Sequence, residues 1–260
     1  MIDNAQKQLI KSVQDCLHGL GIKPGETIYL HSDAIIVGQF AGQGNQRGIN
    51  IFIDAIEDYL GKNGTLILPT YTYSFTKNEI YDVLKTPSCV GLITEIFRQR
   101  HGVMRSPEPI FSIAASGKNN NLYGECDPFE CLGQGSSFEM LHKNSGWVVG
   151  MGCSFNRATF IHYVEKTLGV DYRYEKQFAG QRILRDGLLQ NWKISYYVRD
   201  LSRKSDIELK KLQAIMIKNK TLKKVALGRA STWAAISSDI FNNATALLTE
   251  QSNSLIEEGN

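Results

Sequence analysis

Short apolar segments of strand length alternate with amphipathic helical segments along this chain. Apolar residues recur at helical spacing in Asp3–Leu20 and Ile49–Leu60, while Thr27–His31 and Thr65–Leu68 are short strands that follow glycine-containing turns. The order helix, strand, helix, strand predicts an α/β protein built in layers. The pattern continues with helices predicted at Val90–Arg100, Ser136–Leu141, Ala158–Leu168 and Ser231–Leu248, and strands at Phe111–Ser116, Gly146–Met151 and Leu188–Val198.

The composition is typical of a soluble globular protein with one large core. Of the 260 residues, 42% are hydrophobic, which is enough for a single domain over residues 1–260. No apolar run approaches the roughly 20 residues needed to cross a bilayer, and Met1–Lys11 has no apolar signal-peptide segment. The five cysteines are irregularly spaced, which favours reduced thiols over disulfides or a zinc site. We therefore expect a cytoplasmic protein with no membrane segment and no metal.

Positive charge is concentrated in one part of the chain. Residues 170–229 contain 15 Lys and Arg against 6 Asp and Glu, whereas the whole chain has a net charge of +3. Such a segment is typical of proteins that bind an anionic partner, and equally of a solvated helix face. No nucleic-acid-binding motif accompanies the charge, which argues against nucleic acid as the partner. We interpret residues 170–229 as an elaboration at the edge of the domain.

The segment Asn156–Glu165 contains the residues best suited to proton transfer. On a helix, His162 and Glu165 are three positions apart and share a face with Thr159. A carboxylate beside an imidazole fixes the tautomer of the ring and stabilises the imidazolium that forms when the ring accepts a proton. The pair predicts a general base, although a His and a Glu at this spacing more often form a simple surface pair.

Polar residues that follow a predicted strand are candidates for binding a ligand. His31, Ser32 and Asp33 lie at the end of Thr27–His31, and such positions in an α/β sheet often line the ligand crevice. Their backbone N–H groups and hydroxyls can hold a pyrophosphate. Arg105 lies in a segment stiffened by proline and is a second candidate for a phosphate contact.

Cys153 offers a different chemistry. It follows the predicted strand Gly146–Met151, a position at the mouth of a cleft. A cysteine nucleophile with His162 as its base would make a thioester hydrolase or a transferase with a covalent intermediate. An inert buried thiol is the commoner alternative for a free cysteine.

Taken together, these segments resemble the aminoglycoside 3-N-acetyltransferase family, whose members use acyl-CoA. The resemblance runs from about residue 20 to residue 235, and it is specific because the pieces occur in the family's order. The matching pieces are Leu20–Gly25 followed by His31 and Ser32, Gly64–Thr70, Gly91 with Glu95, Phe97 and Arg98, Arg105 and Ser106 with Pro109 and Ser112, Ser136, Thr159 with His162 and Glu165, and Leu227 and Gly228 with Ala230. The resemblance implies a layered α/β/α fold with a central mixed sheet, distinct from the common acetyltransferase fold.

The resemblance also implies roles for individual residues. His162 is expected to be the general base, with Glu165 orienting it and Thr159 supporting the site. The residues expected along the coenzyme A channel are His31, Ser32, Asp33, Arg105, Ser106, Phe111 and Ser112. The implied reaction is direct transfer of an acyl group from acetyl-CoA, or from a longer acyl-CoA such as 3-hydroxybutanoyl-CoA, to an amine.

Two departures from the family's pattern bear on the acceptor. Glu108 stands where the family usually has a histidine, and Asp33 where it usually has a second serine. Both add negative charge near the expected cleft. They fit either a point that binds an ammonium group or an acceptor other than an aminoglycoside.

The acceptor is predicted from the charge of residues 170–229. Aminoglycosides are polycations and suit an acidic site, whereas a basic segment suits an acceptor that carries phosphate. The resemblance to sugar N-acyltransferases of the family then favours a nucleotide-linked amino sugar, of the dTDP-3-amino-3,6-dideoxyhexose type, in surface-polysaccharide (O-antigen) biosynthesis. The alternatives are an aminoglycoside acetyltransferase that confers antibiotic resistance, the hydrolase that uses Cys153, and a non-catalytic module that binds acyl-CoA. The general frequency of two-fold symmetric dimers favours a homodimer.

Overall fold

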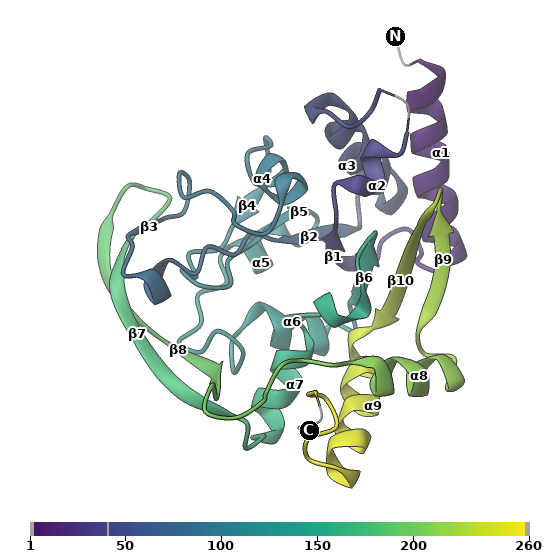
Figure 1. The fold of residues 1–260 in the computed structure, drawn as a ribbon. Coiled ribbons are helices and arrows are strands. Elements are labelled where there is room, and N and C mark those ends of the chain that lie inside the picture. The colour runs from purple at the N-terminus through teal and green to yellow at the C-terminus, as the bar shows by residue number, and fades with distance from the viewer. Residues whose placement is uncertain (1–2, 41, 258–260) are drawn as a thin grey trace.

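A mixed β-sheet forms the centre of the computed structural model, which describes residues 3–40 and 42–257 (Figure 1). Within those residues the sheet has seven strands. They are β1 (Thr27–Ser32), β2 (Thr65–Pro69), β4 (Met104–Arg105), β5 (Ile113–Gly117), β6 (Trp147–Met151), β9 (Lys223–Leu227) and β10 (Ala230–Ile236). Their order across the sheet is β4-β5-β2-β1-β6-β10-β9. The central strand β1 runs parallel to both β2 and β6, and the outer pairings are antiparallel.

Helices cover both faces of this sheet. The helices packed on one face are α1 (Asn4–Gly19), α2 (Ile35–Gly38), α3 (Gln46–Leu60) and α4 (Leu92–Arg98). Those on the other face are α5 (Asn120–Gly124), α6 (Ser137–Lys143), α7 (Ile161–Leu168), α8 (Lys210–Lys218) and α9 (Ser237–Glu250), and the short 3-10 turns are η1 (Ser74–Lys77) and η2 (Phe155–Arg157). No helix in the described part of the chain is both long and apolar enough to span a membrane.

The alternation of side chains along β1 separates the two hydrophobic layers. Ile28 and Leu30 pack with the α1–α4 layer, whereas Tyr29 packs with the layer that contains α6 to α9. Successive residues of a strand point to opposite faces, so one strand contributes to both cores. The predicted layered α/β/α architecture is therefore confirmed.

A second, three-stranded sheet lies beside the first. Its strands are β3 (Tyr81–Asp82), β7 (Arg173–Ile183) and β8 (Leu189–Arg199), in the order β3-β7-β8. The β7–β8 hairpin is the long curved ribbon at the left of Figure 1. Residues 170–229, which were predicted to form an elaboration at the edge of the domain, contain this hairpin. The same segment also supplies β9, which is a strand of the central sheet.

Two predicted boundaries are wrong. Residues 231–236 were expected to begin a helix, but they form most of β10, and the helix begins at Ser237. Strand β10 is hydrogen-bonded to β6 on one side and β9 on the other, and this pairing overrides the helical propensity of its alanines. The helix predicted to begin at Ala158 begins at Ile161, after the 3-10 turn η2.

Candidate active site

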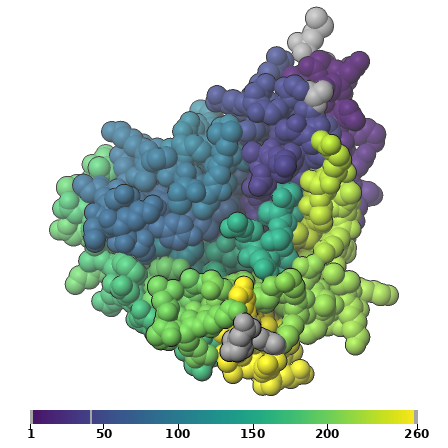
Figure 2. Space-filling model, viewed as in Figure 1, coloured from purple at the N-terminus to yellow at the C-terminus, as the bar shows by residue number. Residues whose placement is uncertain are grey.

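A cavity of about 380 Å³ lies where the carboxyl ends of β1, β2 and β6 meet. These three strands are parallel neighbours, so the residues that follow them converge at one edge of the sheet. The residues that line the cavity are His31, Ser32, Asp33, Pro69, Tyr71, Tyr73, Cys89, Val90, Thr94, Cys153, Arg157 and Thr159. In the space-filling view, the teal segment around β6 lies between the blue surface of earlier residues and the yellow-green surface of β9 and β10 (Figure 2). His31, Ser32 and Asp33, the predicted residues at the end of β1, thus line the same cavity as Thr159.

Two polar groups in the cavity wall are available to a ligand. Nε2 of His31 and Oγ of Ser32 are buried and have no hydrogen-bond partner among the described residues. Burial, with the nearby charge of Arg157, lowers the pKa of His31 to about 3. The ring is therefore neutral at physiological pH. Buried polar groups without a partner are uncommon, and a bound ligand is one way to satisfy them.

Hydroxyl groups line the part of the cavity next to the segment that contains His162. The hydroxyls of Tyr29 and Tyr71 are 2.6 Å apart, and Tyr71 and Thr159 both line the cavity. Burial raises the pKa of both tyrosines well above the usual value, so both are neutral. Thr159 thus lies at the cavity, three residues before the predicted base.

His162 and Glu165 lie side by side on α7. Nδ1 of His162 is 2.6 Å from Oε2 of Glu165, and the Glu165 side chain has no exposed surface. The Tyr172 hydroxyl donates to the other carboxylate oxygen, Oε1, over 2.9 Å. Nε of Arg173 lies 2.8 Å from Oε2 as an ion pair. The sequence had left open a simple surface pair, but the carboxylate is fully buried and held by three groups.

These contacts set the charge of the pair. Burial opposes ionisation of Glu165, but His162, Arg173 and Tyr172 outweigh it and hold the pKa of the carboxyl below its usual value. Burial and the charge of Arg173 lower the pKa of His162 despite the opposing effect of Glu165. At neutral pH the pair is therefore a carboxylate beside a neutral imidazole, which is the form that accepts a proton.

The imidazole is next to the cavity rather than in its wall. His162 does not line the cavity, whereas Thr159 does. The backbone N–H of His162 donates to the carbonyl of Thr159. About 20% of the His162 side chain is exposed, so part of the ring faces away from the core. His162 thus lies between the other two predicted catalytic residues, three positions after Thr159 of the cavity wall and three before Glu165 on α7.

Arg105 and Ser112, predicted to bind coenzyme A, are buried behind the cavity. The guanidinium of Arg105 donates to the backbone carbonyls of Thr70 and Thr86, over 2.7 Å and 2.5 Å. The Ser112 hydroxyl donates to the carbonyl of Thr70 over 2.7 Å. Neither residue lines the cavity. Their visible role is to fix the chain that continues from β2 into the cavity wall.

Ser106 and Phe111 are also buried and lie outside the lining. Oγ of Ser106 accepts the backbone N–H of Ile113 over 3.0 Å. The Phe111 ring packs edge-on between Tyr71 and Tyr196, with ring centroids 5.0 Å from each. Phe111 therefore joins the cavity wall to strand β8.

The two departures from the family's pattern have different environments. Asp33 is exposed and lines the cavity, so its carboxylate can meet a ligand. Glu108 is 4% exposed and accepts the backbone N–H groups of Ile110, over 2.8 Å, and Phe111. Burial raises the pKa of Glu108 to about 7. Glu108 therefore caps its own loop, and the ammonium-binding point expected from it is not in the cavity.

The positive charge of residues 170–229 does not gather at the cavity. The structure describes all of these residues, and none of them lines the cavity. Several of their cations are paired with carboxylates elsewhere, in the pairs Arg182–Asp127, Arg199–Asp206, Arg203–Asp171, Lys204–Glu257 and Lys210–Glu208. The structure thus removes the main reason for expecting a phosphorylated acceptor.

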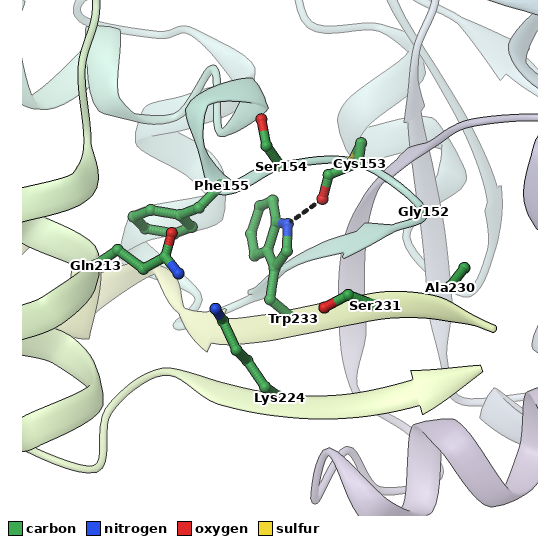
Figure 3. A pocket seen from close by; sticks show the side chains of 9 residues that line it. All are labelled: Gly152, Cys153, Ser154, Phe155, Gln213, Lys224, Ala230, Ser231 and Trp233. Atoms are coloured by element: carbon green, nitrogen blue, oxygen red, sulfur yellow. Dashed lines mark hydrogen bonds between the residues drawn. The ribbon is translucent and has the colours of Figure 1, made fainter. Parts of the chain in front are cut away.

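A second cavity of about 370 Å³ adjoins the first at Cys153, which lines both. Figure 3 shows its walls, which include Gln213 from α8, Lys224 from β9 and the indole of Trp233 from β10. The indole N–H of Trp233 donates to the carbonyl of Cys153 over 2.9 Å. Burial raises the pKa of the Cys153 thiol to about 11, which disfavours the thiolate that a nucleophile needs.

Three residues of the site, Tyr71, Tyr172 and Arg173, were not predicted from the sequence. Tyr71 lines the cavity, while Tyr172 and Arg173 hold Glu165. A local signal for the last two was present, because Gly169 ends α7 in the left-handed conformation with φ of 68°. That turn brings the chain back along the helix, so the residues just after it meet Glu165.

Comparisons with known proteins agree with the fold. The chain is 27% identical over 178 residues to the SPbeta prophage-derived aminoglycoside N(3')-acetyltransferase-like protein YokD of Bacillus subtilis (strain 168), a match that covers 60% of this chain and 64% of YokD. The match spans a little less than two-thirds of YokD. The structure of the present chain resembles that of aminoglycoside acetyltransferase AAC(3)-IVa, with a TM-score of 0.79 at 22% identity, over 96% of this chain and 91% of that one. The present structure also resembles AAC-IIIb, solved in a binary complex with CoASH, with a TM-score of 0.81 at 17% identity. That match covers 93% of this chain and 96% of AAC-IIIb.

The sequence profile described as aminoglycoside 3-N-acetyltransferase matches residues 30–249, a region that contains both the cavity and the His162–Glu165 pair. This match extends over most of the chain and agrees with the resemblance inferred from the motifs. The protein therefore belongs to the aminoglycoside 3-N-acetyltransferase family.

Proposed function

We propose that this protein transfers an acetyl group from acetyl-CoA to an amine of an aminoglycoside, with His162 as the general base. The observation that carries the proposal is the His162–Glu165 pair, neutral on the imidazole and one turn from Thr159 in the cavity wall. A neutral imidazole can accept a proton, and a carboxylate beside it orients the ring and stabilises the imidazolium that forms. Membership of the family supplies the class of reaction.

The contact with Glu165 identifies the basic nitrogen. A carboxylate can only accept, so the 2.6 Å contact makes Nδ1 of His162 the protonated nitrogen. Nε2 is then free to take a proton from the acceptor amine. The amine nitrogen attacks the thioester carbonyl carbon and the C–S bond breaks. The departing thiolate of coenzyme A then receives from Nε2 the proton that the amine gave up. Glu165 stabilises the imidazolium between these two steps.

The first cavity has the properties expected of a thioester site. Its volume of about 380 Å³ is within the usual range for small-molecule sites. His31 Nε2 and Ser32 Oγ supply unpartnered polar groups inside it. Neutral donors that are already in place stabilise the oxyanion formed during acyl transfer. We assign the thioester end of acetyl-CoA to this cavity, with His31, Ser32 and Asp33 beside it.

Charges near the base support a cationic acceptor. Glu130 and Glu175 are both about 40% exposed and share one cation, Lys166, one turn beyond His162 on α7, so this cluster keeps a net negative charge. Asp33 adds a carboxylate on the cavity side. Aminoglycosides carry several ammonium groups, which such carboxylates attract. AAC(3)-IVa, which has a similar fold, has been solved in complex with apramycin.

A nucleotide-linked amino sugar is the second candidate acceptor. Arg157 is exposed and lines the cavity, where it can meet a phosphate. The aminoglycoside is preferred because Arg157 lies outside the basic 170–229 segment, and none of the basic residues of that segment lines this cavity.

The experiment that tests the proposal is a turnover assay with two acceptor panels. Wild-type protein is incubated with acetyl-CoA and either aminoglycosides or nucleotide-linked amino sugars, and products are identified by mass spectrometry. The proposal predicts an acetylated aminoglycoside in the first panel. Turnover confined to the second panel would show that the acceptor is a nucleotide-linked amino sugar, and the proposed role of His162 as the base would stand. Hydrolysis of acetyl-CoA without any acetylated amine, or no turnover with either panel, would overturn the proposal.

A further inference from the structure

One nitrogen of His162 has two competing partners. Nδ1 is 2.6 Å from Oε2 of Glu165, which can only accept, and 3.0 Å from Nη2 of Arg173, which can only donate. Nδ1 cannot satisfy both at once. If it carries the proton it donates to Glu165, and Nε2 is free as a base. If it accepts from Arg173, Nε2 carries the proton and the ring cannot act as a base.

The guanidinium of Arg173 is held firmly in this position. Its side chain is 4% exposed, and Arg173 is the first residue of β7. Nη1 donates to the backbone carbonyl of Tyr197 over 3.3 Å. Tyr197 belongs to β8, the partner strand of β7, so the hairpin itself holds the charge beside the ring. The contact does not depend on a flexible surface side chain.

The other charged and titratable groups around the pair are accounted for. Tyr172 donates to Glu165, and burial raises the pKa of Tyr172, Tyr196 and Tyr197, so these hydroxyls are neutral. The next cation on the helix is Lys166, which is paired with Glu130 and Glu175. Glu165 and Arg173 are therefore the two charges in direct contact with the imidazole.

We propose that Arg173 is a positioning residue that keeps the His162–Glu165 pair ready to accept a proton. It neutralises the buried carboxylate, which remains ionised and accepts the N–H of His162. It also places a positive charge next to the ring, which opposes premature protonation. The charge-assisted bond to the carboxylate is the shorter of the two contacts to Nδ1, so it sets the tautomer.

The pKa directions agree with this assignment. The charge of Arg173 acts to lower the pKa of both members of the pair. Without that charge the pair takes up its proton at higher pH, because a charge in contact with an ionisable group shifts its titration strongly. The titration then belongs to the pair as a whole. The consequence for turnover rests on the proposed function, whereas the titration itself does not.

The test compares Arg173→Met, which removes the charge, with Arg173→Lys, which keeps it. Arg199→Met is the matched control, because Arg199 is the cross-strand partner of Arg173 but pairs with Asp206 at the surface. The titration and tautomer of His162 are followed by NMR on protein with ¹⁵N-labelled histidine. The pH profile of kcat/KM is measured with whichever acceptor is turned over.

The expected results are specific. In the wild type, the neutral ring carries its proton on Nδ1. In R173M, the titration of His162 moves to higher pH, and kcat/KM falls about tenfold more at the acidic end of the profile than on the alkaline plateau. R173K stays close to the wild type, and R199M is unchanged.

Three results would overturn the inference. They are a wild-type ring protonated on Nε2, an R173M titration that stays at the wild-type pH, and a loss of kcat/KM in R173M that is uniform across pH. The wild-type tautomer is measured whether or not R173M folds, and a ring protonated on Nε2 would by itself overturn the inference. A shifted titration in a protein that acetylates no amine would support the role of Arg173 and reject the proposed function.

Discussion

Oε2 of Glu165, on a side chain with no exposed surface, lies 2.6 Å from Nδ1 of His162. An isolated buried carboxylate would be strongly destabilising, so the protein compensates with an ion pair to Arg173 and a hydrogen bond from Tyr172. Such an arrangement is difficult to account for as a stabilising surface pair. It is readily explained if the carboxylate must remain ionised beside a ring that gains and loses a proton.

Replacing His162 with alanine should lower kcat by about 10²–10⁴-fold, because that is the usual contribution of a general base. Binding of coenzyme A should change little, since His162 does not line the cavity. Steady-state kinetics and calorimetric titration with coenzyme A measure the two effects. His101→Ala is the control, because His101 is exposed and far from α7 in the chain. Turnover of H162A near the wild-type rate would remove His162 from the mechanism.

His31 should make the protein less stable in acid. Its folded-state pKa is about 3, whereas an unfolded histidine titrates near 6.5. Between these values the unfolded chain binds a proton that the folded protein does not, so the free energy of unfolding falls as the pH falls. The contribution of His31 is about 2 kcal/mol between pH 7 and pH 5.

Denaturant unfolding of His31→Gln tests this point. The variant cannot titrate at this position, so it should lose about 2 kcal/mol less than the wild type on going from pH 7 to pH 5. For the control His101→Gln, the free energy of unfolding should fall between pH 7 and pH 5 by as much as in the wild type, because His101 is exposed. An identical pH dependence for H31Q and the wild type would mean that His31 takes up a proton in the folded protein as readily as in the unfolded chain.

The fold was predictable because its central elements have strong local patterns. Strands β1, β2 and β6 are short apolar segments, and α1 and α3 have apolar residues at helical spacing. Strand β7 was not predicted, since most of its residues are exposed and alternate poorly. Strand β10 was mistaken for a helix, because its conformation is imposed by pairing with β6 and β9.

The site was predictable only where its residues are adjacent in sequence. His162, Glu165 and Thr159 share one segment, and His31, Ser32 and Asp33 share another. Contacts between distant segments, such as Tyr29 with Tyr71, leave no mark in a single sequence. The charge of residues 170–229 was misleading for the same reason, since a sequence shows the sum of charges but not the carboxylates that pair with them.

Cys153→Ala should leave transfer to the amine essentially unchanged. Burial raises the pKa of the thiol to about 11, so little thiolate is present at neutral pH. Its Sγ contacts the backbone carbonyl of His31 at 3.7 Å. Mass spectrometry of the intact wild-type protein after exposure to acetyl-CoA should show no acetyl adduct at Cys153. An adduct that forms and decays with turnover, and is lost in C153A together with activity, would establish covalent catalysis instead.

Gly150→Ala should destabilise the fold, because there is no room for a side chain at this position of β6. Gly150 faces Trp233 across the β6–β10 pair, and an added Cβ would lie 2.1 Å from the indole ring. The indole cannot easily move, since it is 2% exposed, packs edge-on against Phe155 and donates to the carbonyl of Cys153. Overpacking of this kind typically costs about 1–3 kcal/mol, which denaturant unfolding would measure. Gly38→Ala is the matched control, because nothing lies within 4 Å of a Cβ at Gly38, and it should change stability by less than about 0.5 kcal/mol. If G150A were as stable as G38A, the indole would not be packed against β6, and the wall shared by the two cavities would have a different shape.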